Sequence, residues 1–159
     1  MAIRVVILTI SDACANGERA DLSGQVLEDM LPKAVFEVCA RSIVPDDYRA
    51  ITRELRGFCD DQGADVVLTT GGTGLGPRDV TPEATANVCD RMAPGLSEIL
   101  RSESSKKTPN AALSRGVSGM RDDTLIINLP GSPKAVRECL EIIVDILPHA
   151  VEMARGGGH

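Results

Sequence analysis

Apolar positions recur along this chain in two patterns, one typical of buried strands and one typical of helices. Nearly continuous apolar runs predict strands at residues 3–10 and 64–70, and a further strand is expected at 35–44. Apolar residues with the period of a helix follow Asp21 and Pro45, so a helix is expected after each of them. Strands and helices that alternate in this order favour a parallel sheet covered by helices on both faces.

The second half of the chain adds further helices and one hairpin. Thr81 is expected to cap a helix with proline at its first position, and Pro94 and Ser132 mark the starts of two others. Segments 113–120 and 124–129 flank a short polar turn, which predicts two antiparallel strands.

Polar and glycine-rich segments predict where regular structure stops. Residues 102–110 are polar and are expected to form a mobile loop, while the helix after Ser132 should reach about Leu147. A last short helix to Ala154 and a flexible tail at 156–159 follow. No linker or repeat is visible. We therefore predict one domain over residues 1–155, a three-layer α/β/α sandwich with a mostly parallel sheet and one antiparallel strand.

Composition narrows the possible functions. The 159 residues are 43% hydrophobic but only 2% aromatic, and the net charge is −6. Broad nucleic-acid binding relies on a basic surface and single-strand binding on aromatic platforms, so we expect no nucleic-acid partner. No apolar run approaches the roughly 20 residues of a membrane span, and the chain enters a strand pattern at once. Neither a membrane anchor nor a signal peptide is therefore expected.

Cysteine and histidine usage favours a cytoplasmic protein without a zinc site. The five cysteines contain no CxxC pair, which is typical of reduced thiols in the cytoplasm. Because there are only two histidines, a zinc site with several His ligands is excluded.

The segment after the third predicted strand carries the strongest chemical signal. It contains Gly71, Gly72 and Gly74, whose amide N–H groups can face an anion because no side chain is in the way. Arg78 offers a bidentate clamp for an anion, and Asp79 offers a metal ligand or an orienting base. The spacing matches neither a Walker A loop nor a GxGxxG fingerprint, and a tight turn without a ligand is the alternative.

Two other predicted strand ends carry residues suited to ligand binding. Ser11 and Asp12 follow the first strand, and Pro130, Gly131 and Ser132 follow the last one. Ligands of parallel sheets lie beyond the carboxyl ends of the strands. If the strands are neighbours, these turns and the turn that contains Gly71, Gly72 and Gly74, called the glycine turn below, would surround one crevice. Capping alone also accounts for Ser132, and turn formation for Asp12.

Other candidate residues are open to two interpretations. Asp46 and Asp47 precede a helix, where capping by an acid is the simpler explanation. Ser114 and Arg115 follow an apolar segment, and Arg115 is either a solvated side chain or an anion ligand.

Taken in order, these motifs resemble one known family. The motifs that carry the resemblance are TISD at 9–12, PD at 45–46, TGGTG at 70–74, PRDVTPEA at 77–84, LSR at 113–115 and NLPGSPK at 128–134. They look like those of the molybdopterin-binding family of MogA and MoaB, over essentially the whole chain. The resemblance implies the molybdopterin-binding fold. It also implies an adenylyltransferase (nucleotidyltransferase) activity, in which AMP passes from ATP to the terminal phosphate of molybdopterin, pyrophosphate is released and Mg²⁺ is required.

The resemblance also implies roles for individual residues. The two functional aspartates of the family correspond to Asp46 and Asp79, which would act in catalysis and hold Mg²⁺. The residues that would bind the nucleotide and the pterin are Ser11, Asp12, Gly71, Gly72, Thr73, Gly74, Arg78, Ser114, Arg115, Pro130, Gly131 and Ser132. The nucleophile is then the substrate's own phosphate, so no catalytic Ser, Cys or His is needed.

Two other functions share these motifs. One is a MoaB-like protein that binds the pterin without turnover, and the other is an oligomeric scaffold that hands the cofactor to a partner enzyme. The presence of both Asp46 and Asp79 favours the enzyme. The family further implies a homotrimer or a hexamer, with handover to a molybdenum-insertion protein.

Overall fold

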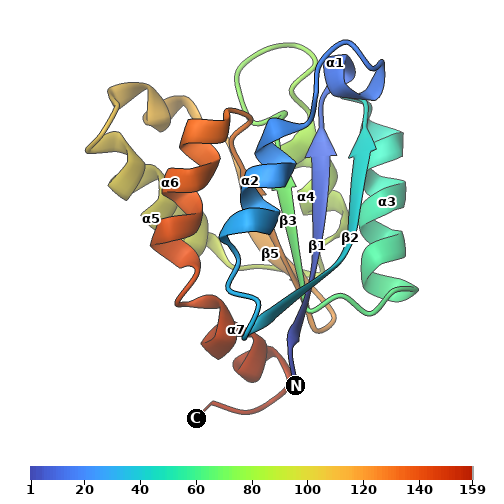
Figure 1. Cartoon of the computed structure of the whole chain (residues 1–159), viewed down its shortest axis with the longest axis vertical. Coiled ribbons are helices and arrows are strands. Elements are labelled where there is room, and N and C mark those ends of the chain that lie inside the picture. Colours follow the sequence, from blue (N-terminus) through green and yellow to red (C-terminus); the bar gives the residue numbers. More distant parts are fainter. Residues whose placement is uncertain (159) are drawn as a thin grey trace.

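A computed structural model describes residues 1–158 as a six-stranded sheet flanked by helices (Figure 1). The strands are β1 Ile3–Ile10, β2 Phe36–Val44, β3 Val66–Thr70, β4 Arg91–Met92, β5 Ser118–Arg121 and β6 Thr124–Leu129. They lie in the order β2-β1-β3-β6-β5-β4. Strand β5 pairs antiparallel with β4 and β6, whereas the β1–β2, β1–β3 and β3–β6 pairs are parallel. The predicted mostly parallel sheet with one antiparallel strand is confirmed.

Helices cover both faces of the sheet, as the three-layer prediction requires. They are α1 Asp12–Ala15, α2 Leu22–Met30, α3 Tyr48–Asp60, α4 Thr81–Val88, α5 Pro94–Ser105, α6 Pro133–Ile143 and α7 Leu147–Ala154, with a 3₁₀ helix, η1 Pro109–Leu113. In Figure 1, α2, α5 and α6 lie on one face and α3 and α4 on the other, while α1 lies beyond the end of β1. No helix within residues 1–158 is long and apolar enough to cross a membrane.

Strand β1 is buried on both faces, in agreement with its continuous apolar run. Val5 and Ile7 belong to the core that includes α2 and α6, and Val6 and Leu8 to the core that includes α3 and α4. Successive side chains of a strand point to opposite faces, so one strand serves both cores. The sheet is therefore a fixed platform, and its strand ends position the loops that follow them.

Some predicted boundaries are confirmed and others are wrong. Strands β1 and β6 begin and end at the predicted residues. The segment 102–110, predicted as a mobile loop, instead continues α5 to Ser105 and then forms η1. Polar residues are compatible with a helix that packs on one face only, so their number alone does not indicate a loop. Helix α6 ends at Ile143 rather than near Leu147, where α7 begins.

The strand predicted at 113–120 is shorter in the structure, where β5 begins at Ser118. The reason is a competing contact, because the N–H of Arg115 donates to the carbonyl of Thr73 at 2.8 Å. Strand β4 and helix α1 are absent from the sequence-based prediction. They have two and four residues, which is too short for a periodic signal.

Not every apolar residue of the helices faces the core. Leu22, Tyr48 and Ile99 have exposed fractions of 59%, 41% and 37%. Leu22 and Tyr48 are the first residues of α2 and α3, so no preceding helical turn packs beside them.

The C-terminal residues continue from α7. The N–H groups of Gly156 and Gly157 donate to the carbonyls of Met153 and Glu152, at 2.9 and 3.0 Å. Position 159, the end of the predicted tail, lies outside the described residues.

Asn128 on β6 joins the sheet to α4 inside the core. Its amide nitrogen donates to the hydroxyls of Thr69 and Thr85, at 3.0 and 2.9 Å. Its oxygen accepts from the N–H of Val117 at 3.1 Å. Asn128 is buried, and buried polar groups are stable only when they are paired.

Replacing Asn128 with alanine would leave these three partners unpaired. We expect Asn128→Ala to lower the free energy of unfolding by about 2 kcal/mol, the scale set by unpaired buried polar groups. Urea unfolding followed by circular dichroism measures the change. Asn87→Ala, at an exposed position of α4, is the matched control. Equal stability of the two variants would contradict this role of Asn128.

Candidate functional site

Three loops meet at the carboxyl ends of β1, β3 and β6, which are neighbours in the sheet. The N–H of Gly71, just after β3, donates to the carbonyl of Leu129 at the end of β6, at 3.1 Å. A Cβ atom at Gly71 would collide with the carbonyl oxygen of Ile10 at the end of β1. The glycine turn is therefore in close contact with both flanking strands, and the loops meet as predicted.

A cleft of about 450 Å³ lies between these loops and is called the main cleft below. It is lined by the end of β1, the turn into α2, Asp46, the glycine turn and the start of α6. Its position beyond the carboxyl ends of parallel strands is where ligands of such sheets bind.

The glycine turn adopts a backbone conformation that favours glycine. Gly71 and Gly72 have φ angles of 103° and 69°, in the left-handed region. The hydroxyl of Thr81 donates to the carbonyl of Gly71 at 2.9 Å, and the N–H of Thr81 donates to that of Gly72 at 3.2 Å. Among residues 1–158 we find no acceptor for the amides of Gly72, Thr73 and Gly74, and Gly72 also lines the main cleft, so its donor is available to an anion.

Two predicted helix caps have different outcomes. Thr81, predicted as the cap of α4, is instead its first residue, and Val80 holds the cap position without a side-chain bond. The hydroxyl of Thr81 is engaged by the glycine turn, so it does not cap the helix. The predicted cap Ser132 is confirmed, since its Oγ accepts from the N–H of Ala135 at 3.1 Å.

Asp12 and Asp46 join two loops through a reciprocal pair of hydrogen bonds. The N–H of each residue donates to a carboxylate oxygen of the other, and both distances are 3.0 Å. The neighbouring Asp47 caps α3 by accepting from the N–H of Ala50 at 2.8 Å. Capping therefore accounts for Asp47 but not for Asp46, which lines the main cleft.

The pKa values of Asp12 and Asp46 shift in opposite directions. The guanidinium of Arg78 donates two hydrogen bonds to Asp12, at 2.6 and 3.0 Å, and holds the pKa of that carboxyl below its ordinary value. Burial raises the pKa of Asp46 above its ordinary value, and the charges of Asp12 and Asp79 add to the rise. A cation beside Asp46 would relieve this repulsion.

Asp79 lines the main cleft together with Asp46. One of its oxygens accepts from the N–H of Gly76 at 2.9 Å, which holds the acid within its turn. Residues 1–158 contain no group of three or more His, Cys, Asp or Glu side chains that could hold a metal. Mg²⁺ often takes one or two carboxylates and completes its shell with water and phosphate oxygens. The donor set therefore fits Mg²⁺ bound together with a phosphate.

Arg78 and Arg115, predicted as anion ligands, bind protein groups in this structure. Arg78 is paired with Asp12, as described above. The guanidinium of Arg115 donates to the carbonyls of Gly74 and Asp79, at 2.8 and 2.7 Å, and to the carboxylate of Glu83. Arg115 thus fastens the glycine turn at two points along its length.

A second hollow of about 230 Å³, called the side pocket below, lies between α5, η1 and α6. Ser114 and Pro130 line it. The hydroxyl of Thr70 donates to the carbonyl of Pro130, and that of Ser23 to the carbonyl of Gly131, both at 2.7 Å. The Pro130–Gly131 turn, which separates the two hollows, is therefore fixed by hydrogen bonds from β3 and from α2.

The predicted binding residues fall in three places. Those in the main cleft are Ser11, Asp46, Gly71, Gly72, Asp79, Gly131 and Ser132. Those in the side pocket are Ser114 and Pro130. Those that line neither hollow are Asp12, Thr73, Gly74, Arg78 and Arg115. The members of this last group belong to, or bond to, the turns that shape the main cleft.

Sequence reasoning missed several residues of the main cleft that carry polar or thiol side chains, namely Thr9, Cys14, Arg19, Asp21, Ser23 and Thr70. Arg19 lies in the segment between α1 and α2 and donates to the Oγ of Ser11 at 3.1 Å. A signal was available for Asp21 and Ser23, because they lie at the start of the helix predicted after Asp21, and helix N-termini beyond strand ends favour anions. The helix expected after Asp21 is confirmed, and the side chain of Asp21 both caps α2 and lines the cleft.

Comparison with known proteins gives consistent matches. The chain matches the family described as "Probable molybdopterin binding domain" over residues 6–149. It is 42% identical over 156 residues to the molybdopterin adenylyltransferase of Helicobacter pylori strain J99, covering 97% of this chain and 89% of that protein. It is 41% identical over 146 residues to the molybdopterin adenylyltransferase of Escherichia coli K12, covering 90% and 74%.

Solved structures agree with this assignment. The molybdopterin biosynthesis enzyme MoaB of Thermus thermophilus has a TM-score of 0.92 and 51% identity, and the match covers 97% of each chain. The chain therefore belongs to the molybdopterin-binding family of MogA and MoaB.

Proposed function

We propose that this chain is a molybdopterin adenylyltransferase, which transfers AMP from ATP to the terminal phosphate of molybdopterin and releases pyrophosphate. The observation that carries the proposal is the placement of Asp46 and Asp79 in one cleft with the glycine turn. Acids beside an anion cradle suit metal-assisted phosphate chemistry better than plain phosphate binding. Relatives of that name, such as those of H. pylori and E. coli, support the same activity.

The two substrates are both anions, and the chain itself has a net charge of −6. Local donors must therefore overcome the repulsion. The amide of Gly72, which lines the main cleft, would donate to a phosphate oxygen, and the N-terminus of α6 at Ser132 adds the positive end of a helix dipole. The glycine turn thereby positions one phosphate group for in-line attack.

Asp46 and Asp79 would hold Mg²⁺, together with phosphate oxygens and water. When bound, Mg²⁺ neutralises charge on the phosphates that react. The raised pKa of Asp46 agrees with this role, because a carboxylate that lacks a cationic partner gains most from a bound cation.

The bond changes need no nucleophile from the protein. An oxygen of the terminal phosphate of molybdopterin attacks the α-phosphorus of ATP, a new P–O bond forms, and the bond to pyrophosphate breaks. The side chains of the main cleft would align the two phosphates and stabilise the negative charge that develops on the leaving pyrophosphate. The main cleft and the side pocket, which share the Pro130–Gly131 turn as a wall, would hold the two ends of the joined substrates.

The same family membership supports two further proposals. The active form would be a homotrimer or a hexamer, and the product would pass to a molybdenum-insertion protein. The apolar side chains of Leu75 and Leu113, both exposed and close to the site-forming turns, are consistent with contacts to other chains.

Pyrophosphate release distinguishes the enzyme from a protein that only binds the pterin. We expect the wild type to release pyrophosphate from ATP when Mg²⁺ and molybdopterin are present, and Asp79→Asn to do so about a hundredfold more slowly, the scale of one lost electrostatic contact. Asn retains an oxygen that can accept from Gly76, so the turn should persist.

The control for this assay is Asp61→Asn, an exposed acid at the end of α3, which should turn over like the wild type. Tight pterin binding by the wild type without pyrophosphate would select the binding protein. Full activity of Asp79→Asn would remove that residue from the proposed site.

Adding a Cβ atom at Gly72 should weaken substrate binding. The atom would collide with the Oγ1 of Thr81 and lie 3.1 Å from a carboxylate oxygen of Asp46. We expect Gly72→Ala to bind ATP about fivefold more weakly, equivalent to about 1 kcal/mol of local strain. Isothermal titration calorimetry measures the affinity. Gly63→Ala is the matched control, since Gly63 has a φ of +62° but open space around its Cβ position. Equal affinities would argue against the cradle.

The raised pKa of Asp46 predicts that its ionised form lowers the stability of the folded chain. In the folded chain this carboxyl resists ionisation, so its charge destabilises the fold as the pH rises above its ordinary value of 3.8. Asp46→Asn without ligand should therefore melt at a higher temperature than the wild type at pH 7, and this advantage should vanish as the pH falls below 3.8. Thermal melts monitored by circular dichroism test this, and a lower melting temperature at pH 7 would contradict it.

A further inference from the structure

Asp21 is an acid in the wall of a cleft proposed to bind anions. It caps α2 by accepting from the N–H of Gly24 at 2.9 Å, and it lines the main cleft. Its side chain is only 8% exposed. A carboxylate at that place stabilises the helix end, but its charge would repel a phosphate in the cleft.

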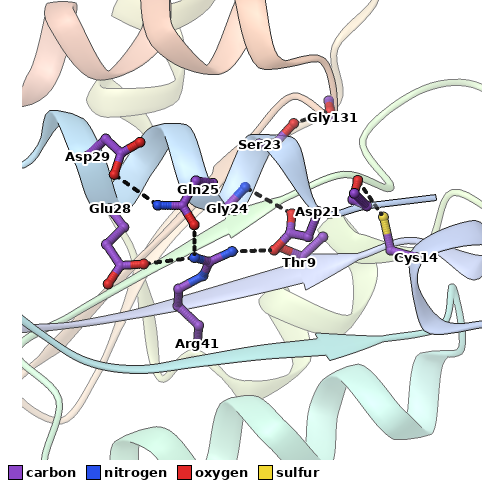
Figure 2. A network of polar contacts seen from close by, with 11 residues as sticks. Thr9, Cys14, Asp21, Ser23, Gly24, Gln25, Glu28, Asp29, Arg41 and Gly131 are labelled. Atoms are coloured by element: carbon purple, nitrogen blue, oxygen red, sulfur yellow. Dashed lines mark hydrogen bonds and ion pairs between the residues drawn. The ribbon is translucent and has the colours of Figure 1, made fainter. Parts of the chain in front are cut away.

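Arg41 supplies the compensating charge from the neighbouring strand β2. Figure 2 shows its guanidinium between Asp21 and Glu28, with nitrogen–oxygen distances of 3.1 and 2.7 Å. The nitrogen that binds Glu28 also donates to the side-chain oxygen of Gln25 at 2.7 Å. Three acceptors on α2 and its cap therefore fix this guanidinium in one orientation.

The same carboxylate connects α2 to the sheet. The hydroxyl of Thr9, near the end of β1, donates to the Asp21 oxygen that also binds Arg41, at 2.8 Å. Two residues after Asp21, in the first turn of α2, the hydroxyl of Ser23 donates to the carbonyl of Gly131 on the opposite wall, at 2.7 Å (Figure 2). A Cβ atom at Gly24 would collide with Asp21 and lie 2.9 Å from the Oγ1 of Thr9, so the helix packs closely on the strand.

We propose that Arg41 is a positioning residue of the main cleft, which neutralises the Asp21 carboxylate and orients the first turn of α2 so that the cleft accepts a phosphate. This inference rests on the proposed function, because it concerns the same anionic substrates. Arg41 acts through Asp21 and need not contact substrate. Its removal should then affect substrate binding more than the chemical step.

Charge variants separate this role from simple loss of structure. Arg41→Gln leaves Asp21 without its cation, so we expect the KM for ATP or for molybdopterin to rise about three- to tenfold, the scale of one added charge near the site, with kcat nearly unchanged. Arg41→Lys should recover part of the loss. The double variant Asp21→Asn with Arg41→Gln removes both charges and should return the KM close to the wild-type value.

Glu28→Gln is the matched control, because it removes the outer partner of the same guanidinium, 39% exposed and outside the cleft. It should leave both kinetic constants unchanged. A structural role alone predicts the opposite for the double variant, which would lose two partners and be worse than Arg41→Gln. That result, or a wild-type KM in Arg41→Gln, would overturn the proposal.

Calorimetric titration with ATP distinguishes a failure of this proposal from a failure of the proposed function. If the wild type binds ATP but does not turn over, the adenylyltransferase proposal fails, and the affinities of Arg41→Gln and the double variant still test the neutralising role. If the wild type turns over and Arg41→Gln shows unchanged ATP affinity and unchanged KM for both substrates, only the role of Arg41 fails. If the wild type neither binds ATP nor turns over, both proposals are contradicted.

Discussion

The close contact of the glycine turn with its two flanking strands is the constraint on which the rest of the site depends. Gly71 donates to the end of β6 and has no room for a Cβ atom against the end of β1. The turn therefore cannot move away from the sheet without breaking contacts on both sides. Thr81 and Arg115 fasten it further, so its unpaired amides are held in place before any ligand arrives. Such preorganisation is what makes fixed dipoles effective in phosphate chemistry.

Four aspartates surround this turn, and arginine pairing divides them into two groups. Asp12 is paired with Arg78 and Asp21 with Arg41. Within residues 1–158, Asp46 and Asp79 have no such cationic partner. The paired acids hold loops together, and their arginine partners compensate their negative charge. The unpaired acids line the main cleft, as does the paired Asp21, but only the unpaired charges there favour a bound cation. An acidic chain can thus gather two anions, because the charge that matters is the local one.

Much of the fold could be predicted from the sequence, because strong local signals specify it. The apolar run of β1 and the turn before β6 identify buried strands without any knowledge of the rest. The glycines and Asp79 could be assigned to one site because they are close in sequence. Only the family resemblance gave Asp46 a role different from that of the neighbouring cap, Asp47. The structural reason is the reciprocal hydrogen bonding with Asp12, which spans 34 residues and leaves no local signal in the sequence. The roles of Arg78, Arg115 and Arg41 could not be predicted, because an arginine carries no sequence signal for its partner.

The central claim is that the main cleft brings two phosphates together for transfer and does not merely hold one. Mass spectrometry of the product mixture tests this most directly, after incubation of the protein with ATP, Mg²⁺ and molybdopterin. The account predicts a new species with the mass of molybdopterin joined to AMP, formed together with pyrophosphate. Recovery of unchanged molybdopterin and ATP, under conditions in which both bind, would contradict it.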